Sequence, residues 1–256
     1  MVTAGGMEVY VAHAGQGARP VLMIHCSLAR HESLLGLAGL LPDARVTLFD
    51  LPGHGRSAAW DGLRDYQQVC VAVAADVVQP GSHVIGHSFG ATVALRLAVE
   101  RPDLVARLTL IEPVFFAAAA GTPEHAAHAR DFALFVAALQ AGDRDTAARV
   151  FHGLWGAGDW DALKPRSRDE AVARIDLVVA GAAAIEQDAA GILPRLAGVQ
   201  MPVTLVRGAM SPPVIGAVQA ALAGAMPQAR QVVIAGAGHM VPVTHAVELA
   251  AVIERG

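Results

Sequence analysis

Cysteine and lysine are almost absent from this chain of 256 residues. Its two cysteines, Cys26 and Cys70, are too few for the disulfide framework that holds small secreted proteins together. The first residues contain neither the basic nor the apolar block of a signal peptide, so we expect a cytoplasmic protein. Lys164 is the single lysine, and the other basic residues are arginines that do not cluster. With a formal net charge of -4, the chain offers no basic surface for nucleic acid or for an anionic membrane.

Charged residues are also scarce, at 16% of the chain, whereas 54% of the residues are apolar and the mean hydropathy is +0.44. Such a composition requires a test for membrane-spanning segments. The best candidate, residues 208–229, carries no charge, but Pro212, Pro213 and Pro227 interrupt it. Its apolar density is too low for about 20 lipid-facing residues. We therefore interpret it as a loop followed by a buried helix, within a chain that has enough apolar material for one large domain or one domain with an insertion.

Short aliphatic runs alternate with longer helical patterns over most of the chain. Such runs are typical of buried parallel strands, and the segments between them are long enough for right-handed helical crossovers. Residues 8–14 alternate between outward and inward positions and predict an antiparallel strand at the sheet edge. The predicted architecture is a doubly wound, mostly parallel α/β sheet. We expect strands at 21–26, 46–51, 82–86, 108–112, 203–208 and 231–235, and helices near 29–41, 64–79, 89–101, 213–225 and 243–254.

One long segment breaks this alternation. It contains no convincing strand, and its apolar residues recur at helical spacing. Ser167 followed by Glu170 fits a capping box at the start of its last helix. We therefore predict a helical insertion over residues 116–184 in a core formed by residues 1–115 and 185–256.

The pentapeptide Gly86-His87-Ser88-Phe89-Gly90 matches the pattern Gly-x-Ser-x-Gly. It follows an apolar strand and opens a helical pattern, which is the setting that a nucleophile elbow requires. The backbone of such a turn is strained at the serine, so the residues two before and two after it must be small. Gly86 and Gly90 meet this condition. The context therefore favours Ser88 as a nucleophile over an incidental serine in a tight turn.

A serine hydroxyl is a weak nucleophile until a base accepts its proton. His239 fits this role best among the 11 histidines, because it follows the last predicted strand and precedes the closing helix. That position lies at the carboxyl edge of the sheet, where catalytic groups gather in open α/β sheets. His25 and His87 lie on a strand end and on the elbow itself, and we expect structural or pocket-wall roles for them.

Together with Ile24-His25-Cys26-Ser27 after one strand and the run at 50–57 after the next, these motifs resemble the α/β-hydrolase fold family. The order and spacing agree along nearly the whole chain. The resemblance implies that the helical insertion is a cap that covers the active site and shapes the substrate pocket. It also implies that Asp50, His54 and Arg56 form a structural turn rather than catalytic machinery.

The oxyanion hole of this family uses two backbone amides, which the resemblance assigns to Ser27 and Phe89. The Phe89 amide would lie at a helix N-terminus, where free donors and the helix dipole stabilise negative charge. Cys26 stands where the family most often has glycine, and its Cβ can alter the turn that carries Ser27. We interpret Cys26 as a small buried filler rather than as a nucleophile.

The acid of the expected catalytic triad is missing from its usual place in this family. That place follows the strand at 203–208 and falls at Met210, or at Ser211 if the gap is aligned differently. Neither residue is a carboxylate. The sequence has no Asp or Glu between Asp188 and Glu248, so a small shift of the alignment does not restore the acid.

Glu112 is the best substitute for the missing acid, because it ends the strand next after the nucleophile strand, on the same edge of the sheet. Some α/β-hydrolases, including a branch of the haloalkane dehalogenases, take their acid from that strand. Two alternatives stay open. Glu112 could instead anchor the start of the cap through a hydrogen bond, or Ser88 and His239 could form a dyad with a water molecule or Ser211 in the place of the acid. A dyad would be slow rather than inactive.

The motifs together predict a serine hydrolase that cleaves a small, largely apolar ester, lactone or thioester through an acyl-enzyme. Dehalogenase chemistry is disfavoured, because that branch carries Asp where this chain has Ser88. Aromatic residues of the insertion are suited to an apolar pocket, and we expect Trp155, together with His25 and Met210, to contact a small-molecule substrate. The histidines are scattered and lack zinc-motif spacing, so no metal or organic cofactor is expected.

Two other functions stay open at this point. The position of Met210 favours a catalytically weak ligand-binding or regulatory homologue. A carbon-carbon bond hydrolase would use the same scaffold. The sequence leaves the oligomeric state open.

Overall fold

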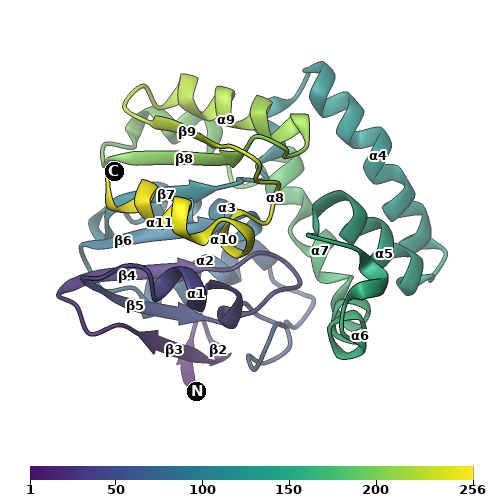
Figure 1. The fold of residues 1–256 in the computed structure, drawn as a ribbon, viewed down its shortest axis with the longest axis horizontal. Helices are drawn as coiled ribbons and strands as arrows, with labels where there is room; N and C mark the ends of the chain where they lie inside the picture. The colour runs from purple at the N-terminus through teal and green to yellow at the C-terminus, as the bar shows by residue number, and fades with distance from the viewer. Residues whose placement is uncertain (256) are drawn as a thin grey trace.

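A seven-stranded sheet with helices on both faces forms the centre of the molecule (Figure 1). The structure, a computed structural model, describes residues 1–255. The strand order is β3-β5-β4-β6-β7-β8-β9, and all neighbouring pairs are parallel except β3 with β5. The doubly wound, mostly parallel sheet is thus confirmed. The antiparallel edge strand is confirmed at residues 11–14, whereas residues 7–9 pair with β1 in a separate two-stranded sheet. The strands are β1 (Val2–Ala4), β2 (Met7–Val9), β3 (Val11–Ala14), β4 (Arg19–Ile24), β5 (Ala44–Phe49), β6 (Ser82–His87), β7 (Val105–Ile111), β8 (Val203–Gly208) and β9 (Arg230–Ile234).

The helices of the sheet region agree with the predicted order but differ in length at two places. The helix expected near 29–41 is a 3-10 turn, His31–Leu34, followed by a single α-helical turn that ends before Gly39. The closing helix is divided at His245. The helices are α1 (Leu35–Ala38), α2 (Tyr66–Val77), α3 (Phe89–Glu100), α9 (Pro213–Ala225), α10 (Val241–Thr244) and α11 (Ala246–Glu254).

Helix α9 confirms the interpretation of residues 208–229 as a loop followed by a partly buried helix. Among residues 1–255, none of the helices combines the length and the apolar character that a membrane crossing requires.

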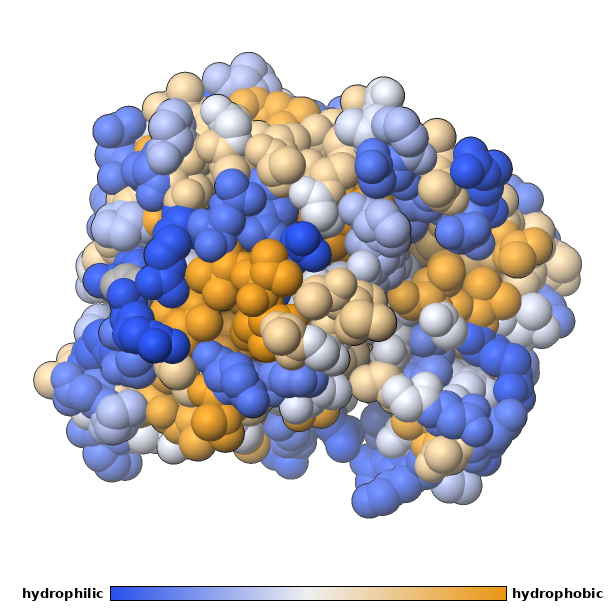
Figure 2. Space-filling view, turned by 45° about the horizontal axis from the view of Figure 1, so that its top comes forward, coloured by the Kyte–Doolittle hydropathy of each residue, from blue (hydrophilic) through white to orange (hydrophobic). Residues whose placement is uncertain are grey.

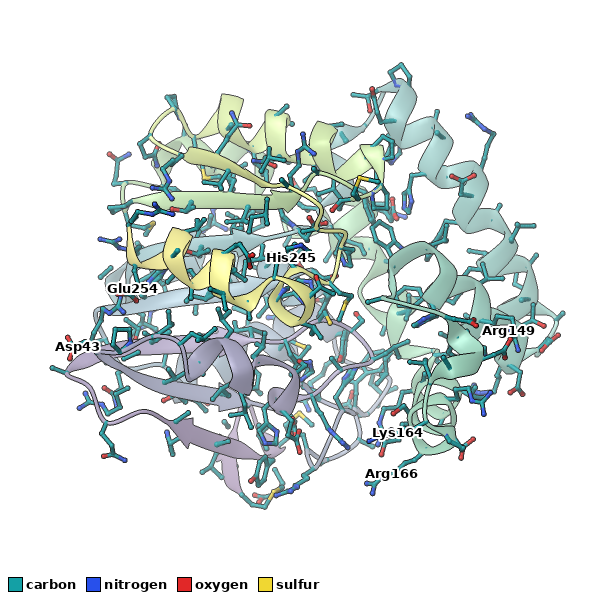
Figure 3. All side chains as sticks on the ribbon, in the orientation of Figure 1. Asp43, Arg149, Lys164, Arg166, His245 and Glu254 are labelled. Atoms are coloured by element: carbon teal, nitrogen blue, oxygen red, sulfur yellow. The ribbon has the colours of Figure 1, made fainter. Side chains whose placement is uncertain are left out.

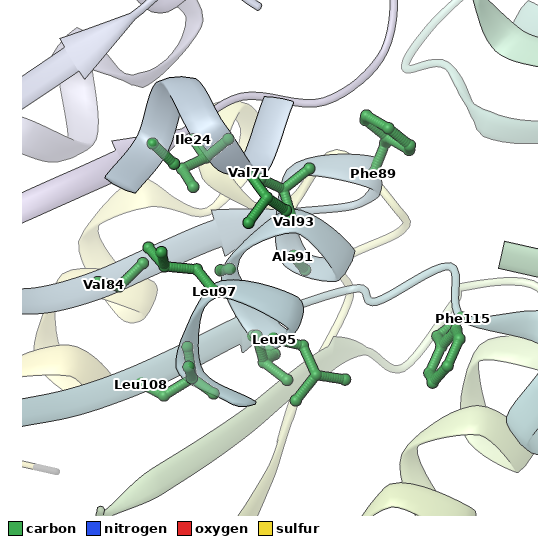
Figure 4. Close-up of a cluster of buried hydrophobic side chains, with 14 of the residues drawn as sticks. Ile24, Val71, Val84, Phe89, Ala91, Val93, Leu95, Leu97, Leu108 and Phe115 are labelled. Carbon is green, nitrogen blue, oxygen red and sulfur yellow. The ribbon is translucent and has the colours of Figure 1, made fainter. Parts of the chain in front are cut away.

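Side chains of the central strands alternate between two cores, one on each face of the sheet. Ile24 of β4 lies in the core under α2, α3 and α9, whereas the preceding Met23 lies in the core under α1 and α11. Figure 4 shows the first of these cores, where Val84 and Leu108 of the sheet meet Leu97 of α3. Because both faces are buried, the ends of β6, β7 and β8 are held firmly, and these ends carry the candidate site.

Between β7 and β8 the described chain forms helices and no strand (Figure 1). These helices lie beside the sheet and have a small core of their own around Phe135, Trp160 and Ile175. The last α-helix of this segment ends at Gln187, slightly beyond the expected boundary at residue 184, and a 3-10 helix, Leu193–Gly198, follows before β8. The main helices of this segment are α4 (Pro123–Gln140), α5 (Arg144–Trp155), α6 (Pro165–Arg174), α7 (Leu177–Ala180) and α8 (Ala182–Gln187).

The predicted capping box is wrong. Helix α6 begins at Pro165, and no side chain caps it. Proline is favoured in the first helical turn because its fixed φ suits the helix and its missing amide hydrogen costs nothing there. Ser167 and Glu170 therefore lie inside α6, and the Glu170 carboxylate pairs with Arg166 and Arg30 instead.

Charged side chains cover the outer side of the helical segment. Arg149 lies on the side of this segment far from the sheet in Figure 3, and it pairs with Asp161 at 2.8 Å. On the face drawn in Figure 2, apolar patches lie between hydrophilic residues, as expected for a chain with few charges.

Candidate active site

Ser88 lies in a tight turn between the end of β6 and the start of α3. Its φ of 56° falls in the left-handed region that non-glycine residues rarely adopt, so the backbone is strained there. Gly86 and Gly90 make the turn possible. A Cβ on Gly86 would lie 2.2 Å from the Gly90 carbonyl oxygen, and a Cβ on Gly90 would lie 2.4 Å from the Ile24 carbonyl oxygen. The two glycines of the pentapeptide are therefore required by close backbone contacts.

The His239 ring lies between the Ser88 hydroxyl and the Glu112 carboxylate. Its Nε2 atom is 2.9 Å from Ser88 Oγ, and its Nδ1 atom is 2.9 Å from Glu112 Oε2. A carboxylate only accepts hydrogen bonds, so we assign the ring proton to Nδ1, which donates to Glu112. Nε2 then accepts from the Ser88 hydroxyl. The structure thus brings three sequence-predicted residues into one hydrogen-bonded chain.

Glu112 directly follows β7 and also has a positive φ, of 53°. Its side chain is fully buried, and its second oxygen accepts hydrogen bonds from the Gly208 amide at 2.5 Å and the Ser211 hydroxyl at 2.7 Å. These donors and the His239 ring compensate the burial of the carboxylate. The Glu112 side chain therefore faces β8 and His239 rather than the helical segment, and Ser211 contacts Glu112 rather than the histidine.

Two residues expected at the substrate lie elsewhere, so their assignment was wrong. The Met210 side chain is 74% exposed and lines neither cavity at Ser88, while its amide donates to the Ala237 carbonyl. His25 is fully buried, its Nδ1 atom donates to the Cys26 carbonyl, and its Nε2 atom accepts from the Leu51 amide. Burial lowers the pKa of His25 to about 4, which keeps the ring neutral and able to accept. His25 is a structural residue that joins two loops.

Phe89 directly follows Ser88, and Ser27 lines the same cavities as Ser88. Phe89 is the first residue of α3, where backbone donors have no helical partner. The loop that carries Ser27 is fixed by the next residue, Leu28, which has a φ of 60° and donates its amide to His54 Nε2 at 3.0 Å. Burial lowers the pKa of His54 to about 3, so this ring also stays neutral and can accept that bond.

Other residues near the site have structural roles. His87 Nε2 lies 2.9 Å from the carbonyl oxygen of His239 and holds the loop that carries it. Cys26 is buried, and burial raises the pKa of its thiol to about 12, so the thiol stays protonated. Burial alone would raise the pKa of Asp50, but hydrogen bonds from the His31 and Arg56 backbone lower it.

His31, Glu32 and Asp50 form the one group of possible metal ligands within residues 1–255. Asp50 Oδ1 already accepts from the amide and ring of His31, and Oδ2 accepts from the Arg56 amide. These bonds explain the cluster as a structural turn, and it does not fit a metal centre.

Two cavities meet at Ser88. The small cavity has a volume of about 50 Å³ and is enclosed mainly by apolar side chains of the helical segment. The large cavity has a volume of about 300 Å³ and is the one that His239 lines. Ser27, Ser88, Phe151 and Trp155 line both cavities, and the Trp155 ring lies 4.7 Å from the His239 ring. Characteristic residues of the small cavity are Phe116, Phe132, Val178, Ile185 and Glu186, and those of the large cavity are Leu28, His152, Trp160, Leu163 and Met240.

Trp155 lines the cavities at Ser88, as predicted from the sequence. Glu186 was not predicted as a lining residue. A signal for it exists in the sequence, because Val178, Ala182 and Glu186 are spaced four residues apart, as on one face of a helical stretch. All three line the small cavity.

A model of the alpha/beta hydrolase family matches residues 21–252. The chain is 37% identical over 115 residues to the dihydrolipoyllysine-residue acetyltransferase component of the acetoin cleaving system of Cupriavidus necator, covering 43% of this chain and 31% of that protein. It is 37% identical over 111 residues to the lipase LipV of Mycobacterium tuberculosis, covering 42% of each protein. The matches thus span less than half the length of these curated relatives.

The fold is shared with solved structures at lower identity. The crystal structure of the enol-lactonase from Burkholderia xenovorans LB400 aligns with a TM-score of 0.78 and 20% identity, covering 99% of this chain and 98% of that chain.

Proposed function

Since the chain belongs to the alpha/beta hydrolase family, we propose that it hydrolyses a small, largely apolar ester, lactone or thioester by way of an acyl-enzyme. One observation carries this proposal: 2.9 Å contacts join the His239 ring to the Ser88 hydroxyl on one side and to the Glu112 carboxylate on the other. Such a chain activates a serine for attack on an acyl carbon. Two similar proteins are named as a lipase and an enol-lactonase, and both names describe hydrolysis of an ester bond.

In the first half of the proposed reaction, Ser88 Oγ attacks the carbonyl carbon while His239 Nε2 takes the hydroxyl proton. Glu112 stays ionised, keeps the other ring proton on Nδ1 and stabilises the imidazolium that forms. The Ser27 and Phe89 amides donate to the oxyanion of the tetrahedral intermediate. His239 then gives its proton to the leaving oxygen or sulfur, the bond to the acyl carbon breaks, and Ser88 carries the acyl group.

In the second half, a water molecule attacks the acyl carbon, and His239 takes one of its protons. When this intermediate collapses, His239 returns the proton to Ser88 Oγ, and the carboxylic acid leaves. Ser88, His239 and Glu112 end in their starting protonation states, so the cycle needs no metal and no organic cofactor.

The two cavities divide the substrate between them. The leaving atom must lie within reach of His239, because it receives its proton from that ring. His239 lines the large cavity and not the small one. We therefore assign the leaving group to the large cavity and the acyl group to the small cavity.

We propose that residues 116–184 act as a cap over a core formed by residues 1–115 and 185–256. Phe151 and Trp155 of α5 border both cavities, so this segment separates Ser88 from bulk solvent and shapes the space for substrate. We also propose that the protein is cytoplasmic. The free, buried thiols of Cys26 and Cys70 suit a reducing compartment.

A ligand-binding homologue without efficient catalysis has less support, because Glu112 lies where it can act as the triad acid that Met210 does not supply. A carbon-carbon bond hydrolase would use the same serine and histidine, so only substrates separate it from an esterase.

Labelling and turnover test the proposed function together. We expect a fluorophosphonate probe to label Ser88 and p-nitrophenyl acetate to be hydrolysed, and both to be lost in Ser88→Ala. Ser33→Ala is the matched control, because Ser33 lines neither cavity, and it should leave both signals unchanged. Absence of labelling, with turnover no higher than in Ser88→Ala, would support the ligand-binding alternative. Turnover of a β-diketone without turnover of esters would support the carbon-carbon bond hydrolase.

A further inference from the structure

The small cavity contains one group that the proposed reaction does not use. Glu186 of α8 is the single ionisable side chain among the described residues that line this cavity. Apart from Ser27 and Ser88 at its inner end, the other lining residues are apolar. The Glu186 side chain is 31% exposed, so it is accessible both to solvent and to a group that occupies the cavity.

The groups nearest to Glu186 do not satisfy its carboxylate. His125 Nε2 lies 3.7 Å from one carboxylate oxygen, and His128 Nε2 lies 4.0 Å from the other. Both distances are too long for hydrogen bonds. Among residues 1–255, the buried His128 Nε2 atom has no hydrogen-bond partner. Burial raises the pKa of Glu186. Burial lowers the pKa of His128 to about 4, so the His128 ring is neutral at pH 7.

Packing keeps this arrangement in place. The His128 ring lies 4.2 Å from the ring of Phe116 and 5.5 Å from that of Trp155, and both of these aromatic residues line the small cavity. Glu186 also borders a groove on the outside of α4, together with Phe132 and Ala182. Glu186 therefore lies between the small cavity and this outer groove.

On the proposed function, which assigns the acyl group to this cavity, we propose that Glu186 is a specificity-determining residue that selects a short acyl group with a hydrogen-bond donor at its far end. A cavity of about 50 Å³ is small, so it suits a short acyl chain. A hydroxyl or ammonium group at the end of that chain can donate a hydrogen bond to the carboxylate. A methyl group there would displace water from the carboxylate and donate no hydrogen bond to it.

Three esters of the same phenol, with acyl chains of matched length, test the proposal: butanoyl, 3-hydroxypropanoyl and 3-aminopropanoyl. Rates measured with Ser88→Ala are subtracted, because they give the uncatalysed hydrolysis of each ester. We expect kcat/KM for the two donor-bearing esters to exceed that for the butanoyl ester by about tenfold, the effect of one hydrogen bond to a charged group at a partly exposed site.

Variants at Glu186 assign the preference to this side chain. Glu186→Leu should abolish the preference by lowering kcat/KM for the two donor-bearing esters. Glu186→Gln keeps an acceptor and removes the charge, so it should retain the preference for 3-hydroxypropanoyl and lose that for 3-aminopropanoyl. It also serves as the test if Glu186→Leu does not fold. Glu248→Gln on the exposed side of α11 is the control and should behave as the parent protein.

A butanoyl ester that is hydrolysed as well as the donor-bearing esters would overturn the assignment, and so would a preference that survives in both Glu186 variants. If none of the three esters shows Ser88-dependent hydrolysis, the proposed function fails and this inference fails with it. If the inference alone fails, Ser88-dependent hydrolysis of the esters is still seen, so the two failures are distinguishable.

Discussion

The Ser211 hydroxyl donates a 2.7 Å hydrogen bond to the Glu112 carboxylate. Ser211 lies in the loop after β8, and Glu112 follows β7, so the bond joins the ends of two neighbouring strands. The loop in which the sequence resemblance places the usual acid therefore holds a carboxylate that comes from the strand beside it.

Replacing Glu112 by glutamine should lower kcat by roughly 10³ to 10⁴-fold, the size of effect seen when a triad acid becomes an amide. The amide loses the negative charge that stabilises the His239 imidazolium and fixes the proton on Nδ1. Steady-state rates with p-nitrophenyl acetate measure the change, and thermal unfolding of the same variant checks that the fold is intact. A folded Glu112→Gln variant with an unchanged rate would remove Glu112 from the triad.

Ser211→Ala should lower kcat by about three- to tenfold and leave KM nearly unchanged, because one of the donors that hold the carboxylate is lost. Ser211→Thr keeps the hydroxyl and should retain most of the activity. Equal rates for Ser211→Ala and the parent protein would mean that the Gly208 amide alone is sufficient to orient Glu112.

In the Glu112→Gln background, Ser211→Asp should recover at least about tenfold in kcat, whereas Met210→Asp should recover none. The Ser211 side chain already reaches the Glu112 carboxylate, so an aspartate there lies close to the position of the lost charge. The Met210 side chain is 74% exposed, so an aspartate there would point into solvent. Recovery by Met210→Asp and not by Ser211→Asp would contradict this geometry.

The buried His83 should make the protein less stable as the pH falls below 6.5. Burial lowers the pKa of His83 to about 3 in the folded state, whereas the unfolded chain takes up a proton near pH 6.5. Between these values the unfolded state binds more protons, so stability falls with decreasing pH. This histidine alone should cost about 2 kcal/mol between pH 7 and pH 5.

His83→Gln isolates that contribution. Glutamine has no ionisable group and can still bond to Thr109, the partner of His83 Nε2 at 2.8 Å. Urea unfolding at pH 7, 6 and 5 should show the parent protein losing stability relative to the variant as the pH falls. A difference that does not change with pH would show that His83 titrates alike in both states.

The sequence was sufficient for those parts of the site that depend on backbone geometry. Buried strands of β-branched residues place their carboxyl ends at one edge, so Ser88, Glu112 and His239 could be expected at neighbouring strand ends. The glycines at 86 and 90 follow from the same argument, since the backbone contacts at the turn leave no room for a Cβ.

The directions of individual side chains could not be predicted from the sequence. Met210 and His25 lie on the right loops, but the Met210 side chain points outward and both His25 nitrogens bond to the backbone. Glu186 depends on how α8 packs against α4, which helical periodicity alone does not determine. Tertiary contacts between helices decide which polar side chain meets a cavity.

The most direct test of the account is the mass of the protein after a brief reaction with p-nitrophenyl acetate and an acid quench. The account predicts one added acetyl group on the peptide that contains Ser88, which disappears as the substrate is exhausted and is absent from Ser88→Ala. Acetylation of another residue on the pathway to product, or turnover that persists in Ser88→Ala, would contradict it.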